Sequence, residues 1–103
     1  MESILEQNTA EIEISFETID GTSIIPSTSH YQLEDKDSGH VIIPLTSFTP
    51  TGVTYNLTVS KASNTIIDDN NSFEVRLLTV VWSYLSEDGA GEYEYKIHQL
   101  EGL

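Results

Sequence analysis

The chain has 103 residues, no cysteine and a formal net charge of −13, because 17 acidic residues face only four lysines and arginines. This length fits one domain with its own hydrophobic core, and without cysteine neither disulfides nor thiolate metal sites can form. Nucleic-acid binding needs clustered cations and anionic membranes repel an acidic surface, so the composition argues against both partners.

The N-terminal residues carry acids where a secretory signal would carry cations, and no apolar run follows them. No segment approaches the roughly 20 apolar residues of a membrane-spanning helix. We therefore expect a soluble protein without a standard secretory signal. Residues 1–9 show no alternation and are expected to form a short N-terminal arm, disordered or ordered on a neighbouring subunit. Residues 10–103 are expected to form a single β-sandwich domain.

From Ala10 onward, apolar and polar residues alternate, which is the period of a strand with one buried face. The predicted strands are residues 10–18, 29–34, 41–45, 53–60, 73–84 and 92–98. Turn signals such as Asp20-Gly21 and the hairpin-like turn of residues 35–39 separate them, and Pro44 indicates an edge strand because proline lacks a backbone donor. The sequence thus predicts an all-β, two-sheet sandwich of about six or seven strands, as in immunoglobulin-like folds.

The segment 73–84 is the longest, and its apolar positions change parity between Leu77 and Leu78. A β-bulge would explain this change, and burial of the middle of the strand on both faces is the alternative. Residues 87–91 contain two glycines and are expected to form a flexible hairpin loop before the last strand. Either the first or the last of these strands is a candidate for a sheet edge.

No catalytic, cofactor-binding or metal-binding residues emerge from the sequence. Residues 35–39 resemble the start of a calcium loop, but Gly39 stands at position 5 and Thr46 at position 12 of the EF-hand pattern, where glycine at 6 and glutamate at 12 are needed. A looser calcium site that combines this loop with Asp68-Asp69 or Glu87-Asp88 remains an alternative. Without a nucleophile elbow or comparable motif, we do not expect an enzyme.

The histidines and the aromatic residues are better explained by structural roles than by a metal-binding or ligand-binding site. The three histidines lie in no metal-binding pattern and are expected to be ordinary strand or turn residues; they are His30, His40 and His98. Six aromatic residues share the inward parity of their predicted strands; they are Tyr31, Tyr55, Trp82, Tyr84, Tyr93 and Tyr95. We therefore expect them to pack in the core and not to form an exposed platform for a sugar or a peptide.

Several short motifs occur together along residues 10–100. They are Asp20-Gly21 followed by Pro26, Tyr31-Gln32-Leu33, Ser38-Gly39, Thr54-x-Asn56-x-Thr58, Asn64-Thr65-Ile66, Glu74-Val75-Arg76-Leu77-Leu78-Thr79-Val80, Tyr93-x-Tyr95-x-Ile97 and Leu100. In this series of turns and inward residues, the chain resembles small immunoglobulin-like or fibronectin type III-like proteins of tailed bacteriophages, which are structural components of the virion.

The resemblance implies a non-enzymatic structural protein of the virion, assembled in the host cytoplasm. It would be a capsid decoration protein or a neck, head–tail or tail component, and would contact capsid, neck or tail subunits and copies of itself. It needs no cofactor, and its acidity favours the exterior of the particle over a surface that lines DNA. The alternative is a carbohydrate- or peptide-binding module, with or without calcium, because fold alone does not fix function.

Overall fold

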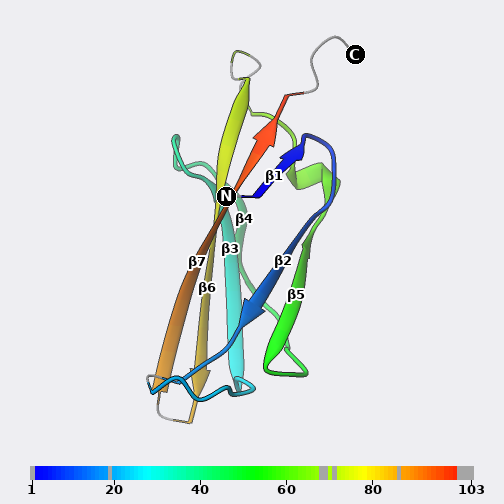
Figure 1. The fold of residues 1–103 in the computed structure, drawn as a ribbon. Helices are drawn as coiled ribbons and strands as arrows, with labels where there is room; N and C mark the ends of the chain where they lie inside the picture. The colour runs from blue at the N-terminus through cyan, green and yellow to red at the C-terminus, as the bar shows by residue number, and fades with distance from the viewer. Residues whose placement is uncertain (1, 19, 68–69, 71, 86, 100–103) are drawn as a thin grey trace.

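The computed structural model describes residues 2–18, 20–67, 70, 72–85 and 87–99. This part of the chain contains seven strands in two sheets and one short 3₁₀ helix, so the expected all-β architecture is confirmed (Figure 1). The elements are β1 (Glu2–Leu5), β2 (Ala10–Ser15), β3 (Thr28–Asp35), β4 (Val41–Ser47), β5 (Thr54–Val59), η1 (Lys61–Ser63), β6 (Phe73–Tyr84) and β7 (Glu87–His98).

The larger sheet has the strand order β1-β7-β6-β3-β4, and the smaller sheet pairs β2 with β5. Only β1 and β7 are parallel among the paired strands of the described chain; the other pairs are antiparallel. The long hairpin of β6 and β7 gives the molecule its extended form, 50 × 21 × 21 Å. In Figure 1, β2 and β5 cross the larger sheet as a second layer.

One apolar core joins the two sheets, because each sheet turns its alternating apolar face inward. In β2, Ile12 and Ile14 are buried while Glu11 and Glu13 are exposed, as the alternation predicts. The other buried apolar residues are Ala10, Phe16, Ile24, Leu33, Leu57, Val59, Ile66, Leu78, Val80, Tyr95 and Ile97. The arrangement is that of a β-sandwich with the small sheet covering part of the larger one.

The turn and edge signals of the sequence are confirmed at three places. Gly21 and Gly39 adopt positive φ angles of 86° and 74°, which an L-residue rarely adopts. The Gly39 N–H donates to the Asp35 carbonyl at 2.8 Å and closes the turn between β3 and β4. Pro44 lies in β4, which is the outer strand of its sheet.

Residues 1–9 do not form a separate arm in the part that the structure describes, so that prediction is corrected. Residues 2–5 form β1 at the edge of the larger sheet, paired with Tyr95–His98 of β7. The Glu6 N–H donates to the His98 carbonyl at 2.8 Å, and Ile4 packs against the core. A four-residue strand that buries a single apolar side chain is too short to produce a recognisable period.

The predicted bulge in residues 73–84 is wrong. β6 pairs residue by residue with both β3 and β7, without a shift of register. Glu74 and Arg76 take inward positions in line with Leu78 and Val80, and all four are buried. Phe73, Val75 and Leu77, which were expected inside, therefore lie on the outer face of the sheet. The apparent change of parity arises because charged residues occupy the first inward positions.

The expected hairpin loop at residues 87–91 is also wrong, since these residues form the first part of β7. β6 ends at Tyr84 and β7 begins at Glu87, so only two residues connect them. Leu85, the first of the two, has a φ of 55° and is 85% exposed. A two-residue connection matches the twist of the strands only with such positive φ angles, which favour asparagine or glycine.

Replacing Leu85 with asparagine is expected to raise the free energy of unfolding by about 0.5–1 kcal/mol, because asparagine tolerates the left-handed conformation better than leucine. Urea denaturation followed by circular dichroism measures the change. Leu85→Ala is the control, because it also removes the exposed leucine side chain but lacks the short polar group with which asparagine hydrogen-bonds locally in the left-handed conformation. Equal gains from both variants would attribute the effect to the side chain and not to the backbone.

Candidate functional site

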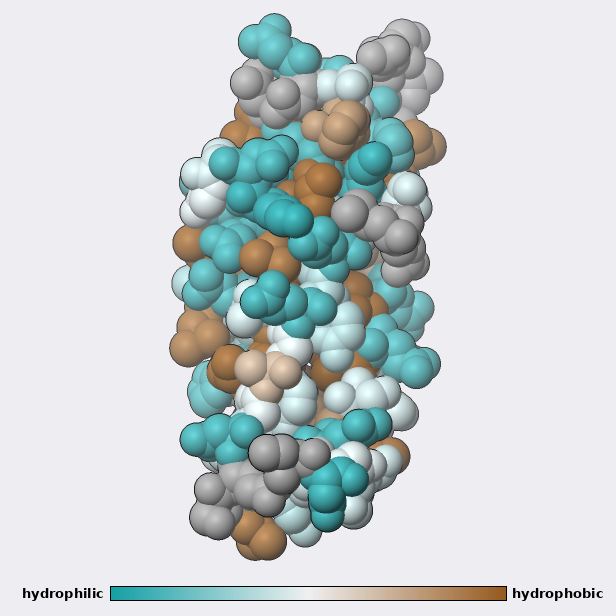
Figure 2. Space-filling model, turned by 60° about the vertical axis from the view of Figure 1, so that its left-hand side comes forward, coloured by the Kyte–Doolittle hydropathy of each residue, from teal (hydrophilic) through white to brown (hydrophobic). Residues whose placement is uncertain are grey.

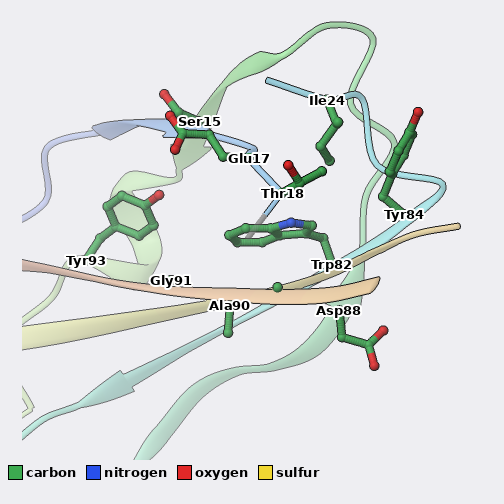
Figure 3. A pocket seen from close by; sticks show the side chains of 11 residues that line it. Ser15, Glu17, Thr18, Ile24, Trp82, Tyr84, Asp88, Ala90, Gly91 and Tyr93 are labelled. Carbon is green, nitrogen blue, oxygen red and sulfur yellow. The ribbon is translucent and has the colours of Figure 1, made fainter. Parts of the chain in front are cut away.

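A cleft of about 710 Å³ opens between the end of β2 and the hairpin of β6 and β7. Figure 3 shows the Trp82 indole at its centre, between Tyr93 on one side and Tyr84 on the other. Residues after the end of β2, including Glu17 and Thr18, lie across the cleft from the indole. The cleft therefore has an aromatic floor and a more polar opposite wall.

Two glycines of β7 create the space for this floor. Gly89 and Gly91 have the same parity as the inward residues Tyr93 and Tyr95, so the inner face of β7 carries no side chain at these two positions. Trp82 stands opposite Gly89 in the register, and its indole lies against the glycine backbone. A Cβ atom at Gly89 would come within 2.4 Å of the indole ring. The glycines, expected to mark a loop, are thus required for packing inside a strand.

Further contacts fix the aromatic side chains of the cleft. The rings of Phe16 and Trp82 meet edge to face, with their centroids 5.4 Å apart. Burial raises the pKa of the Tyr93 hydroxyl above its ordinary value, and a hydrogen bond with the Ser15 backbone opposes part of this increase. Tyr93 therefore bridges from β7 to Ser15 at the end of β2 and lies at one end of the cleft.

The prediction that the six inward aromatic residues pack against the core is confirmed. Tyr95 is fully buried in the core, and the other five are partly buried against it. Three of these five, Trp82, Tyr84 and Tyr93, also line the cleft. Parity predicted which face of the strand they occupy, but not that the second sheet leaves this end of the larger sheet partly uncovered.

The charged residues that line the cleft are both acidic. Glu17 is exposed on the side of β2, and Asp88 belongs to β7. In Figure 3 the Asp88 side chain points away from the indole, and its Oδ1 accepts a hydrogen bond from the Ser83 hydroxyl at 2.7 Å. Glu17 lies across the cleft from the indole, with its side chain toward Ser15 and Tyr93, so the charged residues at the rim of the cleft are negative.

A second polar group lies at the other end of the sandwich, inside the core. The Arg76 guanidinium is fully buried and makes ion pairs with Asp35 at 2.9 Å and Glu74 at 3.0 Å. Its Nη2 donates to the Thr65 carbonyl at 2.8 Å. Glu74 also accepts from the Ile67 N–H at 2.9 Å, so the cluster fastens the loop after η1 to the larger sheet. A buried charge needs such partners because its desolvation is costly.

Tyr95 and Asn64 extend the polar interior beside Arg76. The Tyr95 hydroxyl donates to Asn64 Oδ1 at 2.7 Å, and Asn64 Nδ2 donates to the Asn8 carbonyl at 2.8 Å. Burial raises the pKa of Tyr95 far above its ordinary value, although the positive charge of Arg76 opposes the shift. Asn64 thereby fixes the segment between β1 and β2. These contacts stabilise the fold, and no local sequence pattern predicts them, because their partners lie far apart in the chain.

The structure keeps the remaining candidate residues apart. His30 pairs with Val81 and His98 with Phe73, near opposite ends of β6, and His40 lies in the turn before β4. In the alternative calcium loop, Asp35 is engaged by Arg76 and by Ser38, whose hydroxyl donates to it at 2.7 Å. Asp68 and Asp69 lie outside the described residues. Among the residues that the structure describes, no three or more histidine, aspartate or glutamate side chains come together in a group that could hold a metal ion.

No helix in the described ranges is long and apolar enough to cross a membrane. Comparisons with family models, with curated proteins and with solved structures found no match for this chain. The features of the molecule that bear on its function are therefore the cleft, the sheet edges and the net charge.

Proposed function

We propose that this chain is a non-enzymatic structural protein of a bacteriophage virion, built as an immunoglobulin-like or fibronectin type III-like sandwich. It acts through protein–protein contacts with capsid, neck or tail subunits, and with copies of itself in the assembled particle. The observation that carries the proposal is the set of sheet edges that no described strand covers. Unpaired edges offer backbone donors and acceptors to another chain.

Two of these edges also carry exposed apolar side chains. On β4, Leu45 is 59% exposed and Val41 lies exposed on the same strand. On β1, at the opposite edge of the sheet, Leu5 is 52% exposed. Apolar groups at sheet edges favour association with a neighbour. The net charge of −13 supports a position on the outside of a particle, away from packaged DNA.

Quantitative mass spectrometry of purified phage particles tests this proposal by counting copies of the chain in each virion. Hundreds of copies are expected for a capsid decoration protein, whereas about six or twelve would match the closed rings of a neck or tail. Absence from the particle would overturn the proposal. A phage whose genome encodes this sequence is the required source.

The cleft favours a second candidate function, a carbohydrate- or peptide-binding module. Such a module presents aromatic side chains near its loops, and Trp82, Tyr84 and Tyr93 are partly open in the cleft. Ligand binding would then raise the melting temperature progressively, with the logarithm of the ligand concentration above the Kd, since only the folded state binds. Thermal unfolding with simple sugars and with Ca²⁺ separates this candidate from the first.

A further inference from the structure

At the edge of β7 that points away from β6, a neighbouring strand pairs with only part of its length. β1 pairs with residues 95–98, and no strand in the described chain pairs with residues 87–94 on the side away from β6. The His98 carbonyl points to the β1 side, where it accepts from Glu6. Alternate residues of a strand direct both backbone groups to the same side. Residues 88, 90, 92 and 94 therefore present their N–H and C=O groups to an open edge.

The open edge and the cleft are parts of one surface. Asp88, Gly89, Ala90, Gly91 and Tyr93 belong to this stretch of β7 and also line the cleft. A strand added at this edge would turn alternate side chains toward the inner face, where β7 carries only hydrogen at its two glycines. Those side chains would enter the cleft above Trp82.

The charges around this surface select the chemistry of an added strand. On the inner side, Glu17 lies across the cleft from the indole, and its side chain extends toward Ser15 and the Tyr93 end of the cleft. On the outer side, Glu92 is exposed and Glu94 is paired with Lys36 at 2.7 Å. An arginine or lysine on the added strand would lay its aliphatic stem and its charge against the indole and reach a carboxylate. An acidic segment would be repelled at both faces.

We propose that residues 88–94 of β7 take an extended, basic segment of a partner protein as an additional strand, with an arginine or lysine of that segment held between Trp82 and Glu17. Backbone hydrogen bonds supply the affinity, and the cleft supplies the preference for a basic side chain. The inference deepens the proposed function, on which it rests, by naming the surface that meets the partner. Figure 2, seen from the side on which β7 lies in Figure 1, shows hydrophilic and hydrophobic residues interspersed, as expected for a polar contact surface.

A library of random ten-residue peptides displayed on yeast tests the chemistry of the partner. Selection on the purified protein is expected to enrich peptides in which arginine or lysine alternates with β-branched residues. Binding of the enriched peptides should fall at least about tenfold in Glu17→Lys, through reversal of the attractive charge. Glu13→Lys is the matched control, since it makes the same change of charge at an exposed residue of β2 that does not line the cleft, and should bind normally. Enrichment of acidic or purely apolar peptides would overturn the inference.

A second variant tests the backbone contacts. Glu92→Pro removes one edge-facing N–H without removing a bond to β6, and proline is tolerated at such an edge. It should abolish peptide binding while the thermal transition is retained. If this variant does not fold, hydrogen exchange in the unmodified protein replaces it. The amides of residues 88, 90, 92 and 94 should exchange quickly when free and become protected by an enriched peptide. Protection of these amides without peptide, together with a dimer in solution, would overturn the inference in favour of a second copy of the chain.

The two proposals fail separately. If particles contain the chain but incorporate Glu17→Lys and Glu92→Pro normally, the inferred surface is wrong and the virion role stands. If the chain is absent from particles while basic peptides still bind at β7, the virion role is wrong and the inferred surface stands within a peptide-binding module.

Discussion

Replacing Arg76 with methionine is expected to lower the free energy of unfolding by about 3–5 kcal/mol, because the change leaves two buried carboxylates without their cation. Asp35 and Glu74 are nearly as buried as Arg76 itself, so water cannot replace the lost charge. Methionine keeps a similar apolar volume, and little of the loss should come from a cavity. Urea denaturation at neutral pH measures the effect.

Two further variants separate charge from geometry at this site. Arg76→Lys keeps the cation but loses the planar guanidinium that contacts Asp35, Glu74 and the Thr65 carbonyl together, so an intermediate loss is expected. Lys36→Met is the matched control, since it also removes a cation paired with a carboxylate, but at the surface. Little change is expected there. Similar losses for Lys36→Met and Arg76→Met would contradict the assignment of the effect to burial.

Replacing Gly89 with alanine is expected to lower the free energy of unfolding by about 1–3 kcal/mol, through overpacking against the indole. The added Cβ would meet three ring atoms of Trp82 at 2.4–2.6 Å, and a ring held by Phe16 cannot turn aside without cost. Trp82 is the only tryptophan in the chain, so its fluorescence reports the displacement directly. We expect a shift of the emission maximum together with the loss of stability.

Glycine positions elsewhere provide a graded series for this test. At Gly91 the added Cβ would lie 3.3 Å from the end of the Tyr93 ring, which predicts a smaller loss. At Gly52 it would meet only the Thr54 carbonyl at 3.7 Å, an ordinary contact, so Gly52→Ala is the control. A Gly89→Ala protein with unchanged stability and emission would show that the indole does not rest on β7.

These predictions concern the two ends of the β6–β7 hairpin, one of which is filled by buried ion pairs while the other opens into the cleft. At one end, the Arg76 ion pairs fill the inward face of β6 with charge and hold a loop. At the other end, Gly89 and Gly91 leave the inward face of β7 without side chains, and the cleft opens over Trp82. The inferred partner surface lies only at the second end. Substitutions at Arg76 are therefore expected to change stability, whereas Glu17→Lys should change binding alone.

The alternation of apolar and polar residues was sufficient to predict the all-β class and the positions of most strands. In β2 and β5 the buried residues follow the period of two without exception among the described positions, as at Ile12 and Leu57. The turns at Gly21 and Gly39 and the edge position of Pro44 were also predictable. Each depends on a local property of the backbone that needs no distant partner.

The predictions failed where a residue occupies an environment in which its type is rarely found. Glu74 and Arg76 break the apolar period of β6, and the ion pairs of Arg76 with Glu74 and Asp35 explain why charged residues occupy inward positions. Gly89 and Gly91 suggested a loop, because glycine is disfavoured in strands. The reason for tolerating them is the Trp82 ring, which comes from the neighbouring strand.

The composition and the alternation of apolar and polar residues were enough to establish the all-β class, the inward faces of most strands and the acidity of the chain. These properties follow from the composition and from the chemistry of neighbouring residues. The packing of the two sheets was needed to learn that β1 joins the larger sheet, that Arg76 is buried and that a cleft adjoins an open edge of β7. Each of those depends on residues far apart in the chain, such as Arg76 with Asp35, that come together only when the sheets pair and pack.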